Sequence, residues 1–399
     1  MMNKNISRLT AIAEKESRLI IGLMSGTSLD GLDVALCEIK GSGLGTKISV
    51  KAFITEPYNA DFKNEVKEIF SKKNIDLQKL CLLNEWIGSI HATIANNCLE
   101  KWNIKNSSID IIASHGQTIF HAPSSLHKQE KFGNGTLQIG DGDHIATATG
   151  ILTISDFRQK NIAAGGEGAP LAIYGDYLLF SKKDEERILL NIGGIANFTY
   201  LPGSLNTGNI FSTDIGPGNT MMDALMQQNF TGEYFDKDAR IARKGTVHEN
   251  LLRELKSNDF FKLPFPKSTG PELFNLNYLQ LAKEKVSAKE LSIEDTMATL
   301  NKFTADTIST AIKNYFTDNT KLSIYCSGGG MHNPLLMEHL QQQLPDCSFD
   351  TTASLGIDPD AKEAVLFAIL ANECICGNPD IFNGGKMIAT SMGKLSFPY

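Results

Sequence analysis

Two glycine-rich turns, each set between two short apolar runs, constrain the fold of this chain most strongly. The first turn, residues 24–31, reads Met-Ser-Gly-Thr-Ser-Leu-Asp-Gly and separates the apolar runs 19–23 and 32–39. The second turn, residues 191–197, reads Asn-Ile-Gly-Gly-Ile-Ala-Asn and again joins two apolar runs. Glycine allows backbone N–H groups to approach anionic oxygens closely. One such hairpin in each half of the chain predicts two loops that enclose a phosphate chain.

Length and charge limit the class of protein. At 399 residues, the chain is long enough for roughly two or three domains. Hydrophobic residues make up 42% and charged residues 21%, as in an ordinary soluble globular protein. The net charge of −7 and the lack of a basic block argue against nucleic acid as a partner. An acidic enzyme still binds a nucleotide where Mg2+ and backbone dipoles supply local positive charge.

The sequence predicts no membrane segment. No apolar stretch of signal-peptide length follows the N-terminus, and none reaches the ~18 residues of a membrane span. The seven cysteines are scattered, and the one close pair, Cys374 and Cys376, lacks the second pair that a zinc site needs. We therefore expect free thiols, no membrane contact and a cytoplasmic location.

The hydrophobic pattern predicts strands and helices in both halves. In the first half, the expected strands are 19–24, 32–39, 48–55, 109–113 and 150–154, and the expected helices are 61–71 and 77–103. In the second half, the expected strands are 187–192, 195–201 and 322–326, and the expected helices include 294–315 and about 360–373. Because the first turn is short, its two flanking strands should form an antiparallel hairpin.

Two halves that each begin with a β-hairpin predict a duplicated actin-like or hexokinase-like architecture. In fold terms, we expect an α/β protein with two ribonuclease-H-like domains around a nucleotide cleft. A polar extension should cover 1–16, a first domain 17–155 and a second domain 156–399, with a return of the final residues to the first domain left open. The break falls near the Gly-rich segment 163–170, which resembles a loop or hinge.

A third glycine element supports this architecture. The sequence lacks the G-x-x-x-x-G-K-[ST] of a P-loop, and no G-x-G-x-x-G follows the first strand. Residues 327–333, Ser-Gly-Gly-Gly-Met-His-Asn, end a strand and precede a helix, where the actin-like architecture places adenine. A triple glycine alone is more often a tight turn. Three glycine elements in this order are much more specific, and they predict ATP as the ligand.

Two charged residues at loop positions are candidates for chemistry. Asp214 precedes Ile-Gly-Pro-Gly-Asn and leads into a helix, as a helix cap would, but at a nucleotide cleft it is a candidate general base. Arg158 follows the strand 150–154, and its planar guanidinium suits a substrate carboxylate. An ion pair of Arg158 with Asp156 or another acid is the structural alternative.

Further polar residues lie where a sugar could bind. His115, Gln117 and Thr118 follow the strand 109–113, at the strand end where ligands gather in α/β sheets. Gln117 and Thr118 are better candidates for sugar-hydroxyl contacts than His115 is for catalysis, since a lone His is usually structural. Glu363, near the start of the last helix, is either a sugar ligand or a solvated surface residue.

Six segments of the sequence form a recognisable set. They are residues 21–33, 114–118, 156–158 with the Gly-rich segment to 171, 191–197, 214–219 and 327–333. Together they resemble the anhydro-N-acetylmuramic acid kinase family, from about residue 19 to the end of the chain. The first segment together with 214–219 is highly specific. This family belongs to the actin-like, hexokinase-like kinases and recycles cell-wall sugar in bacteria.

The resemblance implies an unusual phosphoryl transfer. The substrate, 1,6-anhydro-N-acetylmuramic acid, has O6 tied to its anomeric carbon, so no free 6-hydroxyl exists. Water must attack the anomeric carbon while the released O6 attacks the γ-phosphorus of ATP, which yields N-acetylmuramic acid 6-phosphate. Asp214 matches the base that takes the proton from water, and Arg158 and Glu363 match substrate-binding positions.

ATP and Mg2+ are the expected cofactors. The expected ATP-binding residues are Gly26, Thr27, Ser28, Leu29, Asp30, Gly31, Leu32, Asp33, Gly193, Gly194, Gly328, Gly329 and Gly330. Asp30 and Asp33 are also the expected Mg2+ ligands, which position the phosphates and do not act as catalytic acids. Thr118 is the expected contact to a sugar hydroxyl.

Some features leave alternatives open. Asn161 stands where the family commonly has Asp, Glu167 stands where it has Gln, and the segment 126–135 is extra. The alternative enzyme is a kinase that acts on another sugar with a free hydroxyl. The alternative that is not an enzyme is an ATP-driven clamp of the chaperone or filament type. The sequence has no room for the partner-binding domain of such a clamp, and it leaves a homodimer open.

Overall fold

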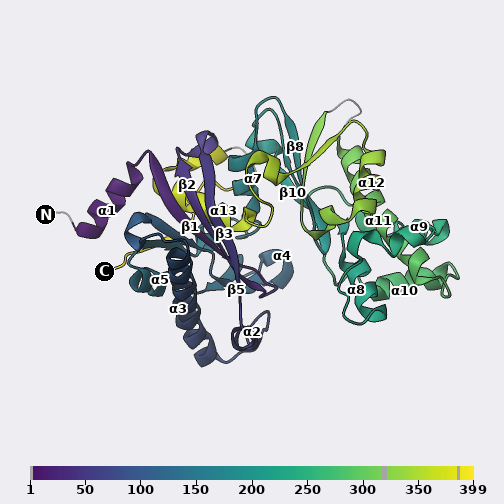
Figure 1. The fold of residues 1–399 in the computed structure, drawn as a ribbon, viewed down its shortest axis with the longest axis horizontal. Helices are drawn as coiled ribbons and strands as arrows, with labels where there is room; N and C mark the ends of the chain where they lie inside the picture. Colours follow the sequence, from purple (N-terminus) through teal and green to yellow (C-terminus); the bar gives the residue numbers. More distant parts are fainter. Residues whose placement is uncertain (1–2, 317–320, 384–386) are drawn as a thin grey trace. The chain divides into compact units, whose positions relative to one another are not determined.

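The computed structural model describes residues 3–316, 321–383 and 387–399, and the chain forms two compact units (Figure 1). The first unit comprises Met1–Phe180 and Gly356–Tyr399, and the second comprises Ser181–Leu355. This division differs from the boundary expected at 155–156, because the chain stays in the first unit to Phe180 and returns to it at Gly356. The segment 163–170, expected to be a hinge, lies inside the first unit.

The first unit contains a six-stranded mixed sheet in the order β13-β7-β4-β1-β2-β3. Its strands are β1 (Ser17–Ser25), β2 (Gly31–Lys40), β3 (Lys47–Pro57), β4 (Ile111–Ser114), β7 (Leu152–Ser155) and β13 (Lys394–Ser396), and a separate two-stranded sheet pairs β5 (Gln117–Ala122) with β6 (Gly135–Ile139). β2 is antiparallel to β1 and β3, whereas β4 runs parallel to β1 and β7. The antiparallel hairpin expected around the first glycine turn is therefore confirmed.

The second unit repeats this strand order. Its sheet runs β10-β9-β8-β11-β12, with strands β8 (Glu186–Ile192), β9 (Ile195–Leu201), β10 (Phe211–Pro217), β11 (Leu322–Ser327) and β12 (Ser348–Thr351). β9 is antiparallel to β8 and β10, and β11 is parallel to β8 and β12. Five strands of the first sheet, from β3 to β7, correspond to the five strands of the second sheet, from β10 to β12. In each set, the first three strands alternate in direction, and the last two run parallel to the third. This shared order confirms the duplicated α/β architecture.

The first unit contains several helices, some of which pack on its sheet. They are α1 (Lys4–Ala13), α2 (Ala60–Lys67), α3 (Leu77–Lys101), α4 (Ser124–His127), α5 (Gly142–Thr149), α6 (Phe157–Ala163), α7 (Ala172–Phe180) and α13 (Lys362–Cys376). Successive side chains of a strand point to opposite faces. Ile21 and Leu23 of β1 accordingly join the core that includes α3, whereas Gly22 between them faces α13. The sheet is thus buried on both faces, which explains the apolar run at 19–23.

Gly22 permits the close approach of α13 to β1. A Cβ atom at this position would lie 1.9 Å from the carbonyl oxygen of Ala364. Ala364 belongs to the first turn of α13, so only a glycine allows the helix to begin this near to the strand. The close packing brings the start of α13 beside the end of β1 that leads into the first glycine turn.

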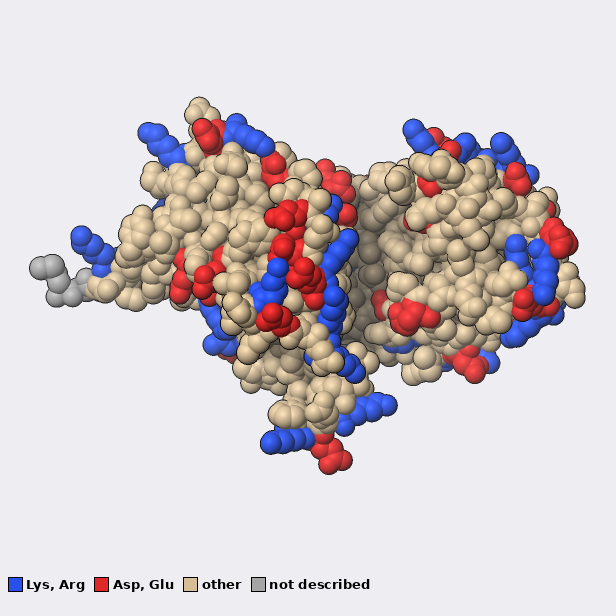
Figure 2. Space-filling model, turned by 90° about the horizontal axis from the view of Figure 1, so that it is seen from below, with Lys and Arg blue, Asp and Glu red and all other residues tan. Residues whose placement is uncertain are grey.

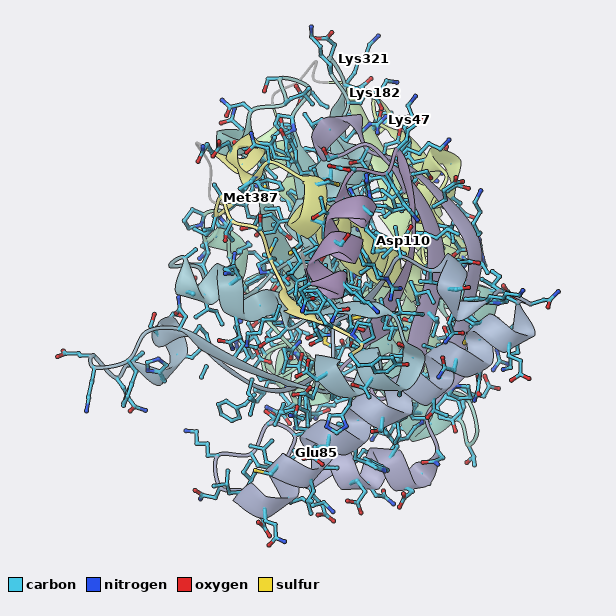
Figure 3. The ribbon with its side chains drawn as sticks, turned by 90° about the vertical axis from the view of Figure 1, so that its left-hand side faces the viewer. Lys47, Glu85, Asp110, Lys182, Lys321 and Met387 are labelled. Atoms are coloured by element: carbon cyan, nitrogen blue, oxygen red, sulfur yellow. The ribbon has the colours of Figure 1, made fainter. Side chains whose placement is uncertain are left out.

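The expected polar extension forms helix α1 and is attached to the first unit. Asn3 caps the helix, because its side chain accepts a hydrogen bond from the Asn5 backbone N–H. The Asn5 side chain donates to the Tyr399 carbonyl at 3.2 Å, and Lys15 forms an ion pair of 2.5 Å with Asp110. Figure 3 shows α1 beside the C-terminal segment, with Asp110 nearby. Helix α1 is therefore part of the folded unit.

Helices of the second unit build two cores. They are α8 (Thr220–Asn229), α9 (Glu249–Leu255), α10 (Leu276–Lys285), α11 (Ile293–Tyr315) and α12 (Pro334–Gln343). One core packs α11 and α12 against the sheet, and the other joins α8, α9, α10 and α11. The long helix expected at 294–315 corresponds to α11, which begins after Ser292 caps the Asp295 N–H. α11 links both cores of this unit.

Among the residues that the structure describes, no helix is both long and apolar enough to cross a membrane. On the face drawn in Figure 2, Lys and Arg side chains lie among Asp and Glu side chains. All seven cysteines lie in the described ranges, and none of them forms a disulfide.

Candidate active site

The first glycine turn joins β1 to β2 and presents polar side chains outward. Leu29 adopts a left-handed conformation, with a φ of 59°, and its side chain is buried. Its backbone N–H donates to the Gly26 carbonyl at 3.4 Å. Thr27, Ser28 and Asp30 are exposed. Leu29 thus anchors the turn in the core, while the hydroxyl groups at its tip remain accessible to a phosphate.

A buried hydrogen-bond network supports the base of this turn. The Ser25 hydroxyl donates to the Gln117 side-chain oxygen at 2.5 Å, and the Tyr58 hydroxyl lies 2.9 Å from that of Ser25. Tyr58 also lies 3.0 Å from Nε2 of His91, whose pKa burial lowers to about 4. The Gln117 amide donates in turn to the Gly26 carbonyl. Gln117, a candidate sugar contact from its sequence position, is fully buried and holds the turn.

Asp33 follows the turn on β2 and carries a perturbed carboxylate. Gly31 and Leu32, also predicted to contact ATP, are buried at the start of the strand and expose no side chain. Burial raises the pKa of Asp33, a hydrogen bond from the Thr55 hydroxyl at 2.5 Å lowers it, and the negative charge of Asp360 raises it. Together these effects leave the pKa of Asp33 raised, and a bound cation would stabilise its ionised carboxylate.

The donor set around Asp33 suits Mg2+ bound together with a nucleotide. Within the described residues, no group of three or more His, Cys, Asp or Glu side chains is arranged to hold a metal. Mg2+ does not require such a group, because it usually keeps several waters and binds one or two carboxylates plus phosphate oxygens. Asp33 and the exposed Asp30 can supply those carboxylates. The residues present therefore fit Mg2+ on a nucleotide better than a free metal site.

Arg158, on α6, is held by two uncharged acceptors. One terminal nitrogen donates to the Gly168 carbonyl at 2.7 Å, and the other lies 3.0 Å from Nε2 of His115. Asp156 instead pairs with Lys394 at 2.6 Å. The alternative reading of Arg158, an ion pair with Asp156, is therefore wrong. Because no carboxylate within the described residues forms a salt bridge with Arg158, its charge is available to an anionic substrate group.

His115 fixes the orientation of Arg158. Burial and the Arg158 charge lower the pKa of His115 to about 3, so its ring is neutral at physiological pH. Its Nδ1 lies 3.3 Å from the Ser25 carbonyl and its Nε2 lies 2.6 Å from the Gln138 side-chain nitrogen. A ring that donates from Nδ1 and accepts at Nε2 satisfies these contacts. Thr118 pairs with Gln138 across the small sheet, so this sugar-contact candidate lies near His115.

Glu363 lies in the first turn of α13, and the charges of Arg158 and Asp33 both affect its pKa. Its side chain reaches solvent, yet desolvation by the surrounding protein raises its pKa. The Lys362 and Arg158 charges lower that pKa, and the Asp33 and Asp176 charges raise it. Lys362 itself pairs with the buried Asp176 at 2.8 Å. The first unit thus brings together three residues far apart in sequence: Asp33, Arg158 and Glu363.

In the second unit, the late glycine run packs directly against the second glycine turn. Gly328 has a φ of 79°, and a Cβ atom there would lie 2.6 Å from Oδ1 of Asn191. A Cβ atom at Gly330 would lie 2.9 Å from the Ile192 carbonyl oxygen. Gly329 between them is exposed. Two glycine elements separated by more than a hundred residues therefore form one surface.

The second turn is also tied to the start of α8. The Gly193 carbonyl accepts from the Asn219 N–H at 2.8 Å, and the Gly194 carbonyl accepts from the Gly218 N–H at 2.9 Å. A Cβ atom at Gly218 would lie 2.2 Å from the Gly193 oxygen. The turn and the N-terminus of α8 are consequently one rigid element, with Gly194 exposed at its tip.

Asp214 lies on strand β10, and not in a loop that leads into a helix as expected. It pairs with Asn197 of β9, next to a bulge. Its backbone N–H donates to the Lys267 carbonyl at 2.9 Å, and its Oδ2 accepts from the Thr269 N–H at 2.9 Å. Burial raises the pKa of Asp214, the Thr269 hydrogen bond lowers it, and Glu272 raises it. A positioned carboxylate with a raised pKa has the properties of a general base.

Asp223 is a second acid in this region that the sequence pattern did not single out. It lies in the first turn of α8, and its N–H donates to the Asn219 carbonyl at 2.8 Å. Burial raises the pKa of Asp223 to about 6. A helix-surface acid has the same sequence signature, so only its burial distinguishes it.

Comparison with known proteins identifies the family. The anhydro-N-acetylmuramic acid kinase family model matches residues 18–394. The chain belongs to the anhydro-N-acetylmuramic acid kinase family. It is 56% identical to the anhydro-N-acetylmuramic acid kinase of Pseudoalteromonas atlantica, with 100% of both chains covered. It is 38% identical to that of Caldanaerobacter subterraneus subsp. tengcongensis, with 98% of this chain and 100% of the relative covered. The predicted kinase activity toward anhydro-N-acetylmuramic acid is thereby confirmed.

One departure from the anhydro-N-acetylmuramic acid kinase pattern has a structural role. Asn161, on α6, accepts a hydrogen bond from the Gly168 N–H at 2.9 Å and donates to the Tyr174 hydroxyl at 3.0 Å. Gly168 provides the carbonyl that holds Arg158. Asn161 thus forms the loop that positions a predicted substrate ligand of the kinase, and an amide serves here because it both donates and accepts.

Proposed function

We propose that this chain opens 1,6-anhydro-N-acetylmuramic acid with water and phosphorylates the released O6 with ATP, in bacterial cell-wall recycling. The water oxygen bonds to the anomeric carbon as the bond from that carbon to O6 breaks. O6 bonds to the γ-phosphorus as the bond to the β-phosphate oxygen breaks, and ADP leaves. The proton lost by the water passes to Asp214. The products are N-acetylmuramic acid 6-phosphate and ADP.

The environment of Asp214 carries this assignment. A general base works best when its pKa lies near the working pH and its carboxylate is held in one orientation. Burial supplies the raised pKa, and the Thr269 N–H fixes Oδ2 at 2.9 Å. The other carboxylate oxygen remains for the water. Positioning by backbone groups costs little reorganisation when charge develops.

The first unit supplies the sugar ligands in this proposal. The substrate carries a carboxylate, and no carboxylate among the described residues forms a salt bridge with Arg158, so a bidentate contact is favoured. Glu363 accepts hydrogen bonds from sugar hydroxyls, and Thr118 adds a hydroxyl donor or acceptor. The Lys362 and Arg158 charges partly offset the burial that raises the Glu363 pKa.

ATP and Mg2+ complete the proposed site. Residues 26–33 contact the phosphates, Gly193 and Gly194 add backbone N–H groups, and 328–330 contact the adenine. Asp30 and Asp33 would hold Mg2+, which would neutralise phosphate charge during transfer. The seven free thiols support a reducing compartment, and we place the reaction in the cytoplasm.

Transfer in oxygen-18 water tests this function. We expect label at the anomeric hydroxyl of the product and none in the phosphate ester, as measured by mass spectrometry of the sugar phosphate after short incubation to limit exchange. Ordinary N-acetylmuramic acid serves as the comparison substrate, since it has a free 6-hydroxyl. Phosphorylation of that sugar alone would instead support a kinase of the conventional type.

A further inference from the structure

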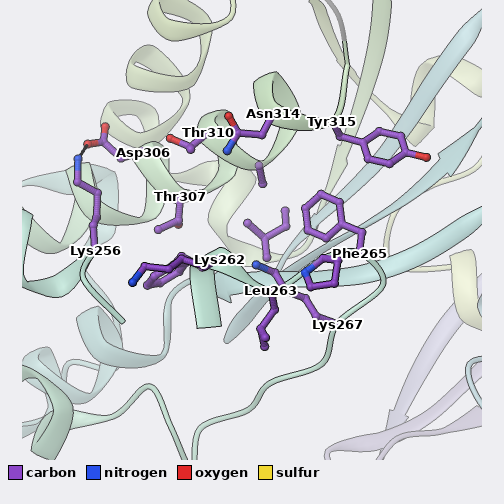
Figure 4. Close-up of a pocket in the computed structure, with 14 residues that line it drawn as sticks. Lys256, Lys262, Leu263, Phe265, Lys267, Asp306, Thr307, Thr310, Asn314 and Tyr315 are labelled. Atoms are coloured by element: carbon purple, nitrogen blue, oxygen red, sulfur yellow. Dashed lines mark hydrogen bonds and ion pairs between the residues drawn. The ribbon is translucent and has the colours of Figure 1, made fainter. Parts of the chain in front are cut away.

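A cavity of about 540 Å³ in the second unit is lined by none of the residues to which a substrate, nucleotide or metal role was assigned above. Residues Asp306, Thr307, Thr310, Asn314 and Tyr315 of α11 line one side, and the segment 261–267 lines the other (Figure 4). Neither the glycine turns nor Asp214 line it. Its size is that of sites for small organic molecules.

The polar lining of this cavity carries excess positive charge. Lys256, Lys262 and Lys267 line it, against the single acid Asp306. Asp306 is already paired, with Lys256 at 2.5 Å and with Lys302 at 2.8 Å. Its carboxylate therefore does not compete for a ligand, and the remaining lysine charge favours an anion.

Lys267 is the lysine with the most unusual surroundings. Its ammonium donates to the Phe260 carbonyl at 2.9 Å and lies 4.4 Å from the Phe260 ring centroid. No carboxylate among the described residues forms a salt bridge with it. Lys262, by contrast, pairs with Asp259 at the surface, where an ion pair contributes little. A carboxylate in the cavity would give Lys267 the opposite charge that the protein does not provide.

Apolar side chains form much of the remaining lining, and Thr310 and Asn314 add polar groups. Phe261, Leu263, Pro264 and Phe265 form one wall. Apolar and aromatic walls with a few placed polar groups are typical of small-molecule sites, and aromatic side chains pack favourably against a ring. We propose that this cavity is a binding site for a small ring-bearing carboxylate, with Lys267 as its charge partner.

The same wall holds the proposed base. The Lys267 carbonyl accepts the Asp214 N–H, and the Lys267 N–H donates to the Thr213 hydroxyl at 3.0 Å. Ile215, the next residue of β10, lines the cavity. An occupant therefore contacts the segment that positions Asp214. Any effect of the bound carboxylate on the rate of phosphoryl transfer rests on the proposed function, whereas its binding in the cavity does not.

Fluorine NMR with a matched pair of probes tests this site. The probes are 4-(trifluoromethyl)benzoate and 4-(trifluoromethyl)benzylamine, which share a ring and differ in charge. They are titrated into the full chain with a nonhydrolysable ATP analogue at saturation, which blocks the nucleotide site. We expect saturable binding of the benzoate and none of the benzylamine. Equal binding of the two probes, or binding of neither, would overturn the proposal.

Variants locate the bound probe. Lys267→Met removes the charge, and we expect about tenfold weaker benzoate binding. Thr310→Trp, at an exposed position of α11, should block the cavity without touching Lys267, so it tests the site even if Lys267→Met does not fold. Lys289→Met, an exposed lysine of the same unit outside the lining, is the matched control. Binding that survives both cavity variants but is lost in Arg158→Ala would place the probe in the sugar site and overturn the proposal. Because the readout needs no turnover, it stands apart from any failure of the kinase mechanism.

Discussion

The backbone N–H of Thr269 donates a 2.9 Å hydrogen bond to Oδ2 of Asp214. The two residues lie on segments more than fifty positions apart, and a second bond, from the Asp214 N–H to the Lys267 carbonyl, aligns those segments. The carboxylate is thereby oriented by main-chain groups, which have less freedom than side chains. Burial raises the pKa of the carboxylate, and the neighbouring segment fixes its direction.

Replacement of Asp214 by Asn should reduce turnover by a factor of about 10³, because an amide cannot take the proton from water. Titration calorimetry with a nonhydrolysable ATP analogue should show unchanged nucleotide affinity. Asp346→Asn, at an exposed position of the same unit, is the control and should retain full activity. Near-normal turnover of the Asp214 variant would remove Asp214 from the role of base.

Removal of the Glu272 charge should shift the pH profile toward acid. Glu272 is exposed, and its negative charge raises the pKa of Asp214. In Glu272→Gln the carboxylate form of Asp214 is less disfavoured, so its pKa falls and the base stays active at lower pH. The acidic limb of kcat/KM should move down by a few tenths of a pH unit. Glu284→Gln, another exposed acid of this unit, should leave the limb unchanged, and a shift toward alkaline pH in Glu272→Gln would contradict the assignment.

Loss of the His115 ring should weaken sugar binding more than catalysis. His115 accepts from Arg158 at 3.0 Å, so His115→Gln disturbs the guanidinium without removing its charge. We expect the KM for the anhydro-sugar to rise about tenfold, with a smaller change in kcat. Arg158→Lys should cost more, because an ammonium cannot make the paired contacts of a guanidinium. Steady-state kinetics gives kcat and KM for these variants, provided that their melting temperatures match that of the wild type. Equal losses in kcat and kcat/KM would instead indicate that His115 acts in the transition state.

Two glycines near the first turn should differ in their tolerance of alanine. At Gly22 a Cβ atom would meet the Ala364 oxygen at 1.9 Å, and we expect Gly22→Ala to lower the free energy of unfolding by about 1–3 kcal/mol. At Gly26 the nearest atom would be Oγ of Ser28 at 3.7 Å, an ordinary contact. Gly26→Ala should therefore keep its stability and lose ATP affinity. Urea denaturation and ATP titration separate the two effects, and a stable Gly22→Ala would argue against the close packing of α13.

Local pattern was sufficient for most elements of the fold. The alternation of apolar residues around the glycine turns predicts the hairpins β1–β2 and β8–β9, and helical periodicity predicts α3, α11 and α13. The division into units differs from the predicted boundary because it depends on which strands share a sheet. β7 and α7 contact the first sheet or its helices, and so does the chain after Gly356. No local signal in 150–180 reports those distant contacts.

The sequence by itself determined the residue types of the site and their family, because glycine turns, acids and an arginine at these spacings are a local signature. The tertiary structure decided which of them act together. It places Asp33 and Arg158 close enough to Glu363 for their charges to affect its pKa. It buries Gln117 in the core, and it packs the second glycine turn against 328–330. It also changes Asp214 from a loop residue to a strand residue held by Thr269. Burial and hydrogen-bond partners arise from segments remote in sequence, and they set the pKa and orientation on which the proposed chemistry depends.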